Sequence, residues 1–139
     1  MAGPGFRFSV PSGWTVHRTP TAVGASRDSA LVSATAFTLL KPYSPALFPR
    51  AAKELDGVAA KLAARSHGEL KAQATTTVDG RRIRAYRFTG RPAAGAAYVE
   101  RIGFVLEGKR EYQLLCQAAS GDPEGACALL FASFHLAGG

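Results

Sequence analysis

Two cysteines are the residues in this sequence best suited to covalent chemistry. Cys116 closes an alternating apolar run, and Cys127 follows eleven positions later. The short connection contains Gly121, Pro123 and Gly125, so the segment after it can fold back over its own strand and bring the two Cβ atoms within bonding range. We therefore expect a disulfide, worth roughly 2–3 kcal/mol of stability. The alternative is two separate buried thiols that behave as small apolar side chains.

Spacings typical of metal sites and catalytic sites are missing. His17, His67 and His135 fall on a predicted strand, a helix end and the chain end, without H-x-x-x-H or H-E-x-x-H spacing. No G-x-S-x-G motif occurs, and Gly3-Pro4-Gly5 precedes a strand rather than the helix of a phosphate loop. We therefore predict no catalytic, cofactor-binding or metal-binding residues, and we expect that the protein is not an enzyme.

Arginines gather on one predicted strand and its exit. The set is Arg81, Arg82, Arg84, Arg87 and Arg91. Because side chains alternate along a strand, Arg82 and Arg84 share one face and Arg81 and Arg87 share the other. Interleaved with aromatic residues, they could bind an acidic protein surface, lipid head groups or, less favourably, nucleic acid. The alternative is a solvated edge whose charge prevents aggregation.

One large aromatic residue follows a chain break. In Pro11-Ser12-Gly13-Trp14, proline and glycine interrupt the strand just before the indole. We expect Trp14 to be mostly buried, because such a turn aims a large ring into the core. The alternative is an aromatic anchor in a ligand groove.

The first half of the chain contains the clearest helix. Apolar residues at helical spacing predict it from Ala46 or Arg50 to Ser66, with Leu55, Val58 and Leu62 facing a sheet. Before it, residues 30–40 are rich in valine, threonine, phenylalanine and leucine and predict a long central strand. Residues 18–29 are polar and small, and we expect a loop there.

The second half of the chain predicts two hairpins and a closing helix. Alternating residues 70–78 and 81–89 flank Asp79-Gly80, a strong turn dipeptide. Residues 97–106 and 111–118 are expected to pair around a turn at residues 107–110. Asp122-Pro123-Glu124 then predicts a helix start. We expect an α+β fold, with a twisted, mostly antiparallel sheet of five to seven strands flanked by helices as an α/β/α sandwich.

Composition is that of one folded domain spanning residues 1–139. Hydrophobic residues make up 47% and charged residues 19% of the chain, and no apolar run reaches the ~18 residues of a membrane span. The net charge of +7 favours acidic partners or anionic membrane surfaces. Strand-like alternation begins at Phe6 with no leader before it, so we expect an upstream signal or membrane anchor in the full-length gene.

The order of these elements resembles the PsbP-like superfamily. The similarity rests on three stretches: Phe8-Ser9-Val10-Pro11-Ser12-Gly13-Trp14, Val78-Asp79-Gly80-Arg81, and Tyr112 to Cys116 followed by a short helix ending Ala132-Ser133-Phe134. That superfamily includes a photosystem II extrinsic protein, a Ran-binding nuclear import factor of yeast and bacterial DcrB-like lipoprotein domains. The resemblance implies a fold and an accessory role, and it assigns no binding residue.

Two functions remain open at this point. The first is a non-enzymatic binding or scaffold module, the soluble domain of an exported bacterial lipoprotein or membrane-anchored protein of actinobacterial type. The alternative is a cytoplasmic adaptor or chaperone-like module that binds an acidic protein or nucleic acid through the Arg81 to Arg91 hairpin. The state of Cys116 and Cys127 separates them, because structural disulfides persist in oxidising compartments.

Overall fold

The computed structural model describes residues 1–65, 67–90 and 97–137. The described residues form these elements in chain order: β1 (Ala2–Gly3), β2 (Phe6–Arg7), β3 (Thr15–Arg18), β4 (Ala22–Arg27), β5 (Ala30–Tyr43), the 3₁₀ turn η1 (Pro45–Leu47), α1 (Phe48–Arg65), β6 (Glu69–Val78), β7 (Arg81–Gly90), β8 (Tyr98–Ala118), the 3₁₀ turn η2 (Pro123–Gly125), α2 (Ala126–Ser133) and β9 (His135–Leu136).

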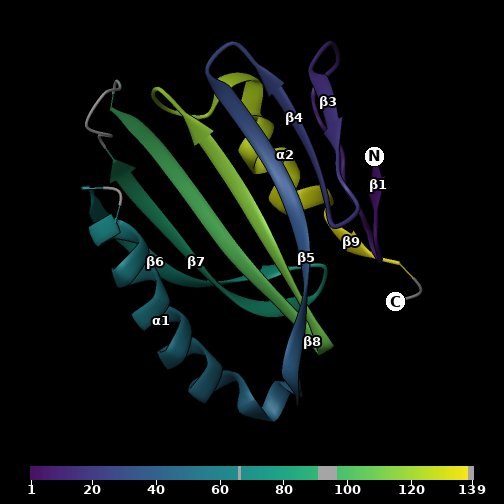
Figure 1. Ribbon diagram of the computed structural model, residues 1–139, viewed down its shortest axis with the longest axis vertical. Coiled ribbons are helices and arrows are strands. Elements are labelled where there is room, and N and C mark those ends of the chain that lie inside the picture. The colour runs from purple at the N-terminus through teal and green to yellow at the C-terminus, as the bar shows by residue number, and fades with distance from the viewer. Residues whose placement is uncertain (66, 91–96, 138–139) are drawn as a thin grey trace.

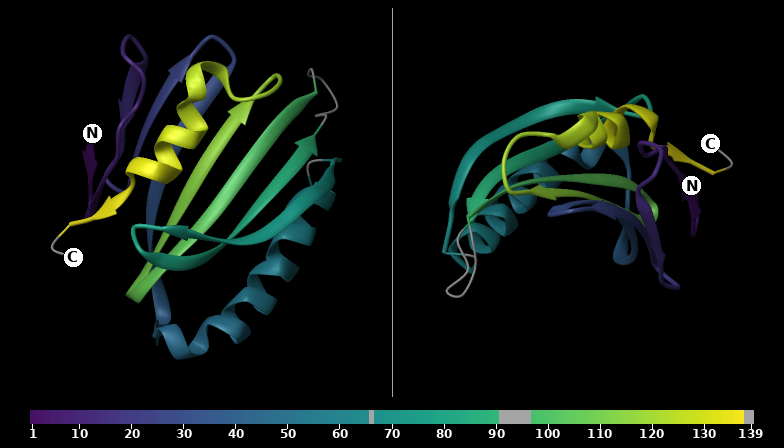
Figure 2. Two further views of the ribbon diagram at one scale, coloured as in Figure 1. Left: turned by 180° about the vertical axis from the view of Figure 1, so that it is seen from behind. Right: turned by 90° about the horizontal axis from the view of Figure 1, so that it is seen from above.

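Six strands form one large antiparallel sheet in the order β3-β4-β5-β8-β7-β6 (Figure 1). The helices α1 and α2 lie on opposite faces of it, as the two views of Figure 2 show. A small sheet, β1-β2-β9, brings the first and last described strands together at one side. The predicted α+β class, with five to seven antiparallel strands, is confirmed.

β8 is one continuous strand, and the predicted turn at residues 107–110 is wrong. Its first part, residues 98–104, pairs with β7, and its second part, residues 110–117, pairs with β5. Gly108 adopts a φ of 55°, and the register with β5 shifts beside it. The turn-forming residues therefore produce an irregularity inside a strand instead of a chain reversal. Across it, the side chains that face α2 change from odd-numbered Val105 to even-numbered Tyr112.

β4 lies where the sequence predicts a loop, and that prediction is wrong. The strand pairs with β3 on one side and with β5 on the other. Val23 and Ala25 are buried on its α2 side. At Gly24, an added Cβ would stand 3.1 Å from both the Val32 carbonyl oxygen and the Ser33 Cβ. Pairing on both sides and close packing therefore outweigh the weak strand propensity of these small and polar residues.

The helix α1 covers β6 and β7, as its apolar spacing predicts. Leu55 packs in the core beneath it, and Leu62 packs against that core. Val58 does not face the sheet, because it is 44% exposed. Ala59, which is 0% exposed, takes the inward position. With 3.6 residues per turn, Val58 lies about 60° to one side of Leu55, whereas the buried Ala59 and Ala63 lie about 40° and 80° to the other side. Val58 therefore falls at the edge of the buried face.

The core on the α2 side is larger and rich in aromatic residues. Phe6 stacks on Phe134, with 5.6 Å between the ring centroids, and meets Tyr112 edge-on. Trp14 is 7% exposed and belongs to this core, as predicted. Its indole N–H donates a hydrogen bond to Glu124 Oε2 at 3.0 Å. The strand β9 pairs with β2, and its Leu136 is buried in the same core as Phe6 and Phe134.

Candidate functional site

Two arginines of β7 are engaged by neighbours in the fold. Arg81 donates from Nε to Glu107 Oε2 at 2.5 Å and from Nη1 to Asp79 Oδ2 at 2.7 Å. The same Asp79 accepts the backbone N–H of Leu136, so this cluster holds β9 against the β6–β7 turn. On the opposite face, the Arg82 guanidinium lies 4.3 Å from the ring centroid of Phe48.

Arg84 joins the sheet to α1. Its guanidinium contacts both oxygens of Asp56, at 3.1 and 3.2 Å, and the Tyr86 hydroxyl donates to Asp56 Oδ1 at 2.5 Å. Burial opposes ionisation of Asp56, but the hydrogen bonds from Tyr86 and Arg84 hold its pKa below the ordinary value. Burial and the neighbouring carboxylate raise the pKa of Tyr86. Arg84 is therefore part of an internal polar network.

The structure does not gather the predicted arginines onto one surface. Arg82 and Arg84 face α1, whereas Arg81 and Arg87 lie on the α2 face, as strand alternation predicts. Arg91 lies outside the described residues. Among the four described arginines of the set, Arg82 and Arg87 form no ion pair with a described carboxylate, and Arg82 lies over the Phe48 ring. Binding through the whole hairpin stays a prediction.

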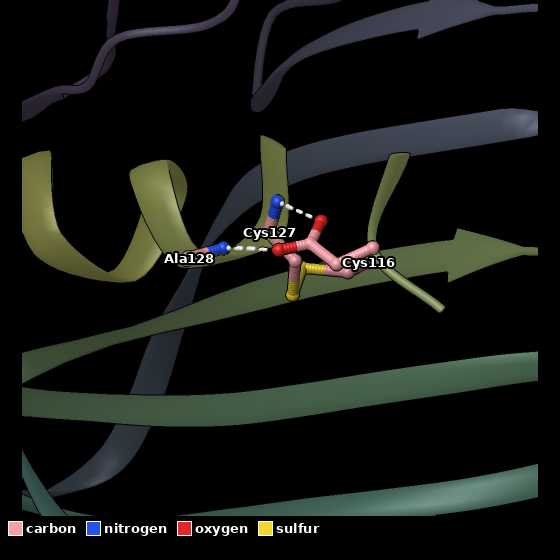
Figure 3. The surroundings of a disulfide bond; sticks show 4 residues. Cys116, Cys127 and Ala128 are labelled. Carbon is pink, nitrogen blue, oxygen red and sulfur yellow. Dashed lines mark hydrogen bonds between the residues drawn. A yellow bond between two sulfur atoms is a disulfide. The ribbon is translucent and has the colours of Figure 1, made fainter. Parts of the chain in front are cut away.

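Cys116 and Cys127 form the expected disulfide, with 5.6 Å between their Cα atoms (Figure 3). The bond ties the end of β8 to the first turn of α2. Asp122 caps the same turn: its Oδ1 accepts the Cys127 N–H at 2.7 Å, and its Oδ2 accepts the Ala128 N–H at 3.0 Å. Asp122 thus caps α2 across the intervening 3₁₀ turn, and α2 begins at Ala126, later than the sequence predicts.

A cavity of about 370 Å³ lies beside this disulfide, between the sheet and the start of α2. Its walls are mainly apolar and include Trp14, Ala30, Val32 and the cystine. Four polar side chains also line it: Arg87, Arg101, Gln117 and Asp122. A largely apolar concavity with a few convergent polar groups is typical of small-ligand sites.

Arg101 is the residue of this cavity that the sequence analysis did not identify. It is the direct partner of Arg87 in the pairing of β7 with β8. Its guanidinium lies 4.1 Å from the ring centroid of Phe131 in α2. Alternation of residues along each strand indicates which face each arginine occupies. Only the strand register places Arg101 opposite Arg87. The candidate site is therefore built from β5, β7, β8 and α2, which bring together residues distant in sequence.

A second concavity of about 400 Å³ lies between η1, α1, β5 and β8. Leu47 and Val58 line it, and both are more than 40% exposed. Its charged residues are of both signs, with Lys41 and Arg50 beside Glu54 and Glu111 in the lining. This mixture selects no ligand charge, so the cavity beside the disulfide is the better candidate.

Within the described ranges, no cluster of three or more histidine, cysteine or acidic side chains could hold a metal ion. Nor does any helix in those ranges have the length and apolar character needed to cross a membrane.

Comparison with known proteins shows a likeness of fold. No protein-family model matches the sequence, and no curated protein matches it. Among solved structures, a protein from Bacteroides thetaiotaomicron VPI-5482 is similar, with a TM-score of 0.66 and 11% identity over 95% of this chain. The match spans 45% of that protein, so this chain corresponds to less than half of it. At this identity the fold alone is shared, and the PsbP-like resemblance stays a prediction.

Proposed function

We propose that this domain is a non-enzymatic binding module that works outside the cytoplasm, as part of an exported bacterial lipoprotein or membrane-anchored protein. Its ligand occupies the cavity beside the disulfide. The observation that carries the proposal is the Cys116–Cys127 bond, which forms one wall of that cavity. Structural disulfides persist in oxidising compartments. A cavity with a cystine in its wall therefore favours a location outside the cytoplasm.

The polar groups around the cavity support binding rather than turnover. Asp122 is the only described carboxylate that lines it, and both its oxygens already accept backbone N–H groups of α2. General acid–base catalysis needs a group within reach of a reacting proton and free to exchange it. The planar guanidinium groups of Arg87 and Arg101 suit recognition of an anionic group.

The cavity is favoured over the arginine hairpin as the binding surface. Arg81 and Arg84 are paired with the protein's own acids, Asp79, Glu107 and Asp56. An acidic partner would have to displace these contacts before it could bind them. Arg87 faces the cavity without such a competitor among the described residues.

The compartment is tested on the full-length gene product in its natural host. Alkylation of freshly isolated, unreduced protein should leave Cys116 and Cys127 unlabelled, and protease added to intact spheroplasts should digest the domain. Two labelled thiols, or protection from the protease, would contradict the extracytoplasmic assignment.

A further inference from the structure

Two positively charged side chains line the cavity, the exposed Arg87 and the half-buried Arg101. Arg87 of β7 and Arg101 of β8 are direct cross-strand partners, and neither forms an ion pair with a carboxylate in the part of the chain that the structure describes. Like charges placed directly opposite each other on a sheet are destabilising. An anion between the two guanidinium groups would convert this repulsion into attraction.

One of the two guanidinium groups is already held in place. Arg101 stacks on the Phe131 ring, which is 8% exposed. The ring itself lies against β8, since a Cβ added at Gly103 would come within 2.7 Å of Phe131 Cε2. A guanidinium held in this way loses little conformational entropy when it binds. Its planar arrangement of N–H groups matches the two oxygens of a carboxylate.

The remainder of the cavity defines the rest of the ligand. The walls near Trp14, Val32 and the cystine are apolar, so they would bind a hydrocarbon group. A volume of about 370 Å³ equals that of roughly a dozen water molecules. This size suits a small molecule and excludes a polymer held entirely within the cavity.

Asp122 limits the ligand's charge. Its carboxylate lines the cavity and is satisfied by the amides of Cys127 and Ala128. A second anionic group on the ligand would meet this negative charge. The lining thus favours a single negative charge at the arginine end and an uncharged, apolar remainder.

We propose that the cavity binds a small organic monocarboxylate, with its carboxylate between Arg87 and Arg101 and its apolar body against Trp14, Val32 and the cystine. This inference rests on the proposed binding function and specifies its ligand class. A carboxylate held by two arginines forms charge-assisted hydrogen bonds, which are among the strongest in proteins.

The test uses benzoate and hexanoate as probes, with benzyl alcohol and hexanol as their neutral counterparts. Trp14 is the only tryptophan in the chain, so its indole N–H resonance reports occupancy of the cavity without ambiguity. We expect the acids to shift this resonance and to bind at least on the order of tenfold more tightly than the alcohols. Inorganic phosphate and succinate should bind more weakly than benzoate.

Arg87→Gln and Arg101→Gln should each weaken benzoate binding on the order of tenfold or more. The matched control is Arg110→Gln, an exposed arginine about 30 Å further along the same strand, which should leave benzoate affinity unchanged. Without ligand, Arg87→Gln should raise the melting temperature, because it removes the like-charge pair. A loss of affinity together with this gain in stability is not expected of a residue with a purely structural role.

The outcomes distinguish failure of the carboxylate site from failure of the cavity as a binding site. If the alcohols bind as tightly as the acids, or if Arg110→Gln weakens benzoate as much as Arg101→Gln, the carboxylate site is overturned while a binding cavity remains. Tighter binding of phosphate or succinate than of benzoate would overturn the monocarboxylate class. If neither acids nor alcohols move the Trp14 resonance at saturating concentration, the carboxylate site and the cavity as a binding site both fail.

Discussion

The side chain of Asp56 connects α1 to β7 through hydrogen bonds. It accepts hydrogen bonds from Arg84 and Tyr86, so Asp56→Ala removes the carboxylate partner of a partly buried guanidinium and of a buried hydroxyl. We expect a loss of about 1–3 kcal/mol in the free energy of unfolding, measured by urea denaturation. Glu54→Ala, which removes the exposed Arg50–Glu54 pair on the same helix, should stay within about 0.5 kcal/mol of the wild type. Equal effects from the two variants would contradict a structural role for Asp56.

Glu100 predicts a pH dependence of stability. It is the cross-strand partner of the buried Phe88, and burial raises the pKa of its carboxyl. Between the ordinary and the raised pKa, the native state binds more protons than the unfolded state, so stability falls as pH rises through that window. Glu100→Gln should therefore be more stable than the wild type at neutral pH, and the difference should vanish in acid below the ordinary glutamate pKa. Thermal denaturation across this pH range measures the difference, and a gain that persists in acid would contradict it.

At the scale of elements, Gly108 in β8 and Gly57 in α1 should respond in opposite directions to replacement by alanine. Gly108 has a φ of 55° at the irregularity in β8, where a side chain is strained, so Gly108→Ala should lower the free energy of unfolding by about 1 kcal/mol. Gly57 is exposed within α1, and an added Cβ would meet no atom within 4 Å. Gly57→Ala should therefore raise stability by about 0.5–1 kcal/mol. Chemical denaturation measures both, and changes of the same sign would contradict this description.

At the scale of the whole molecule, the disulfide joins β8 to α2. The double variant Cys116→Ser, Cys127→Ser should lose about 2–3 kcal/mol, because the unfolded chain is no longer constrained by the closed loop. The wild type treated with reductant should melt at a similar temperature to the variant, whereas reductant should leave the variant itself unchanged. A variant as stable as the oxidised wild type would show that the bond adds nothing to stability.

Local sequence pattern determined a helix, a turn and a buried position of this protein. The i, i+4 spacing beneath α1, the Asp79-Gly80 turn between β6 and β7, and the burial of Trp14 were all predictable. Each depends on periodicity or turn chemistry among neighbouring residues, which a sequence records directly. The disulfide was also predicted, because the connection between its cysteines is short enough for the chain to fold back.

Tertiary structure alone decided the rest. β4 exists because two strands pair with its small residues, and β8 passes through its turn-like residues because β5 and β7 hold its two ends. The candidate site also depends on tertiary structure: Arg101 becomes a partner of Arg87 only through strand register, and Phe131 of α2 packs against Arg101. Register and layer packing depend on contacts between distant segments, and single-residue preferences do not encode them.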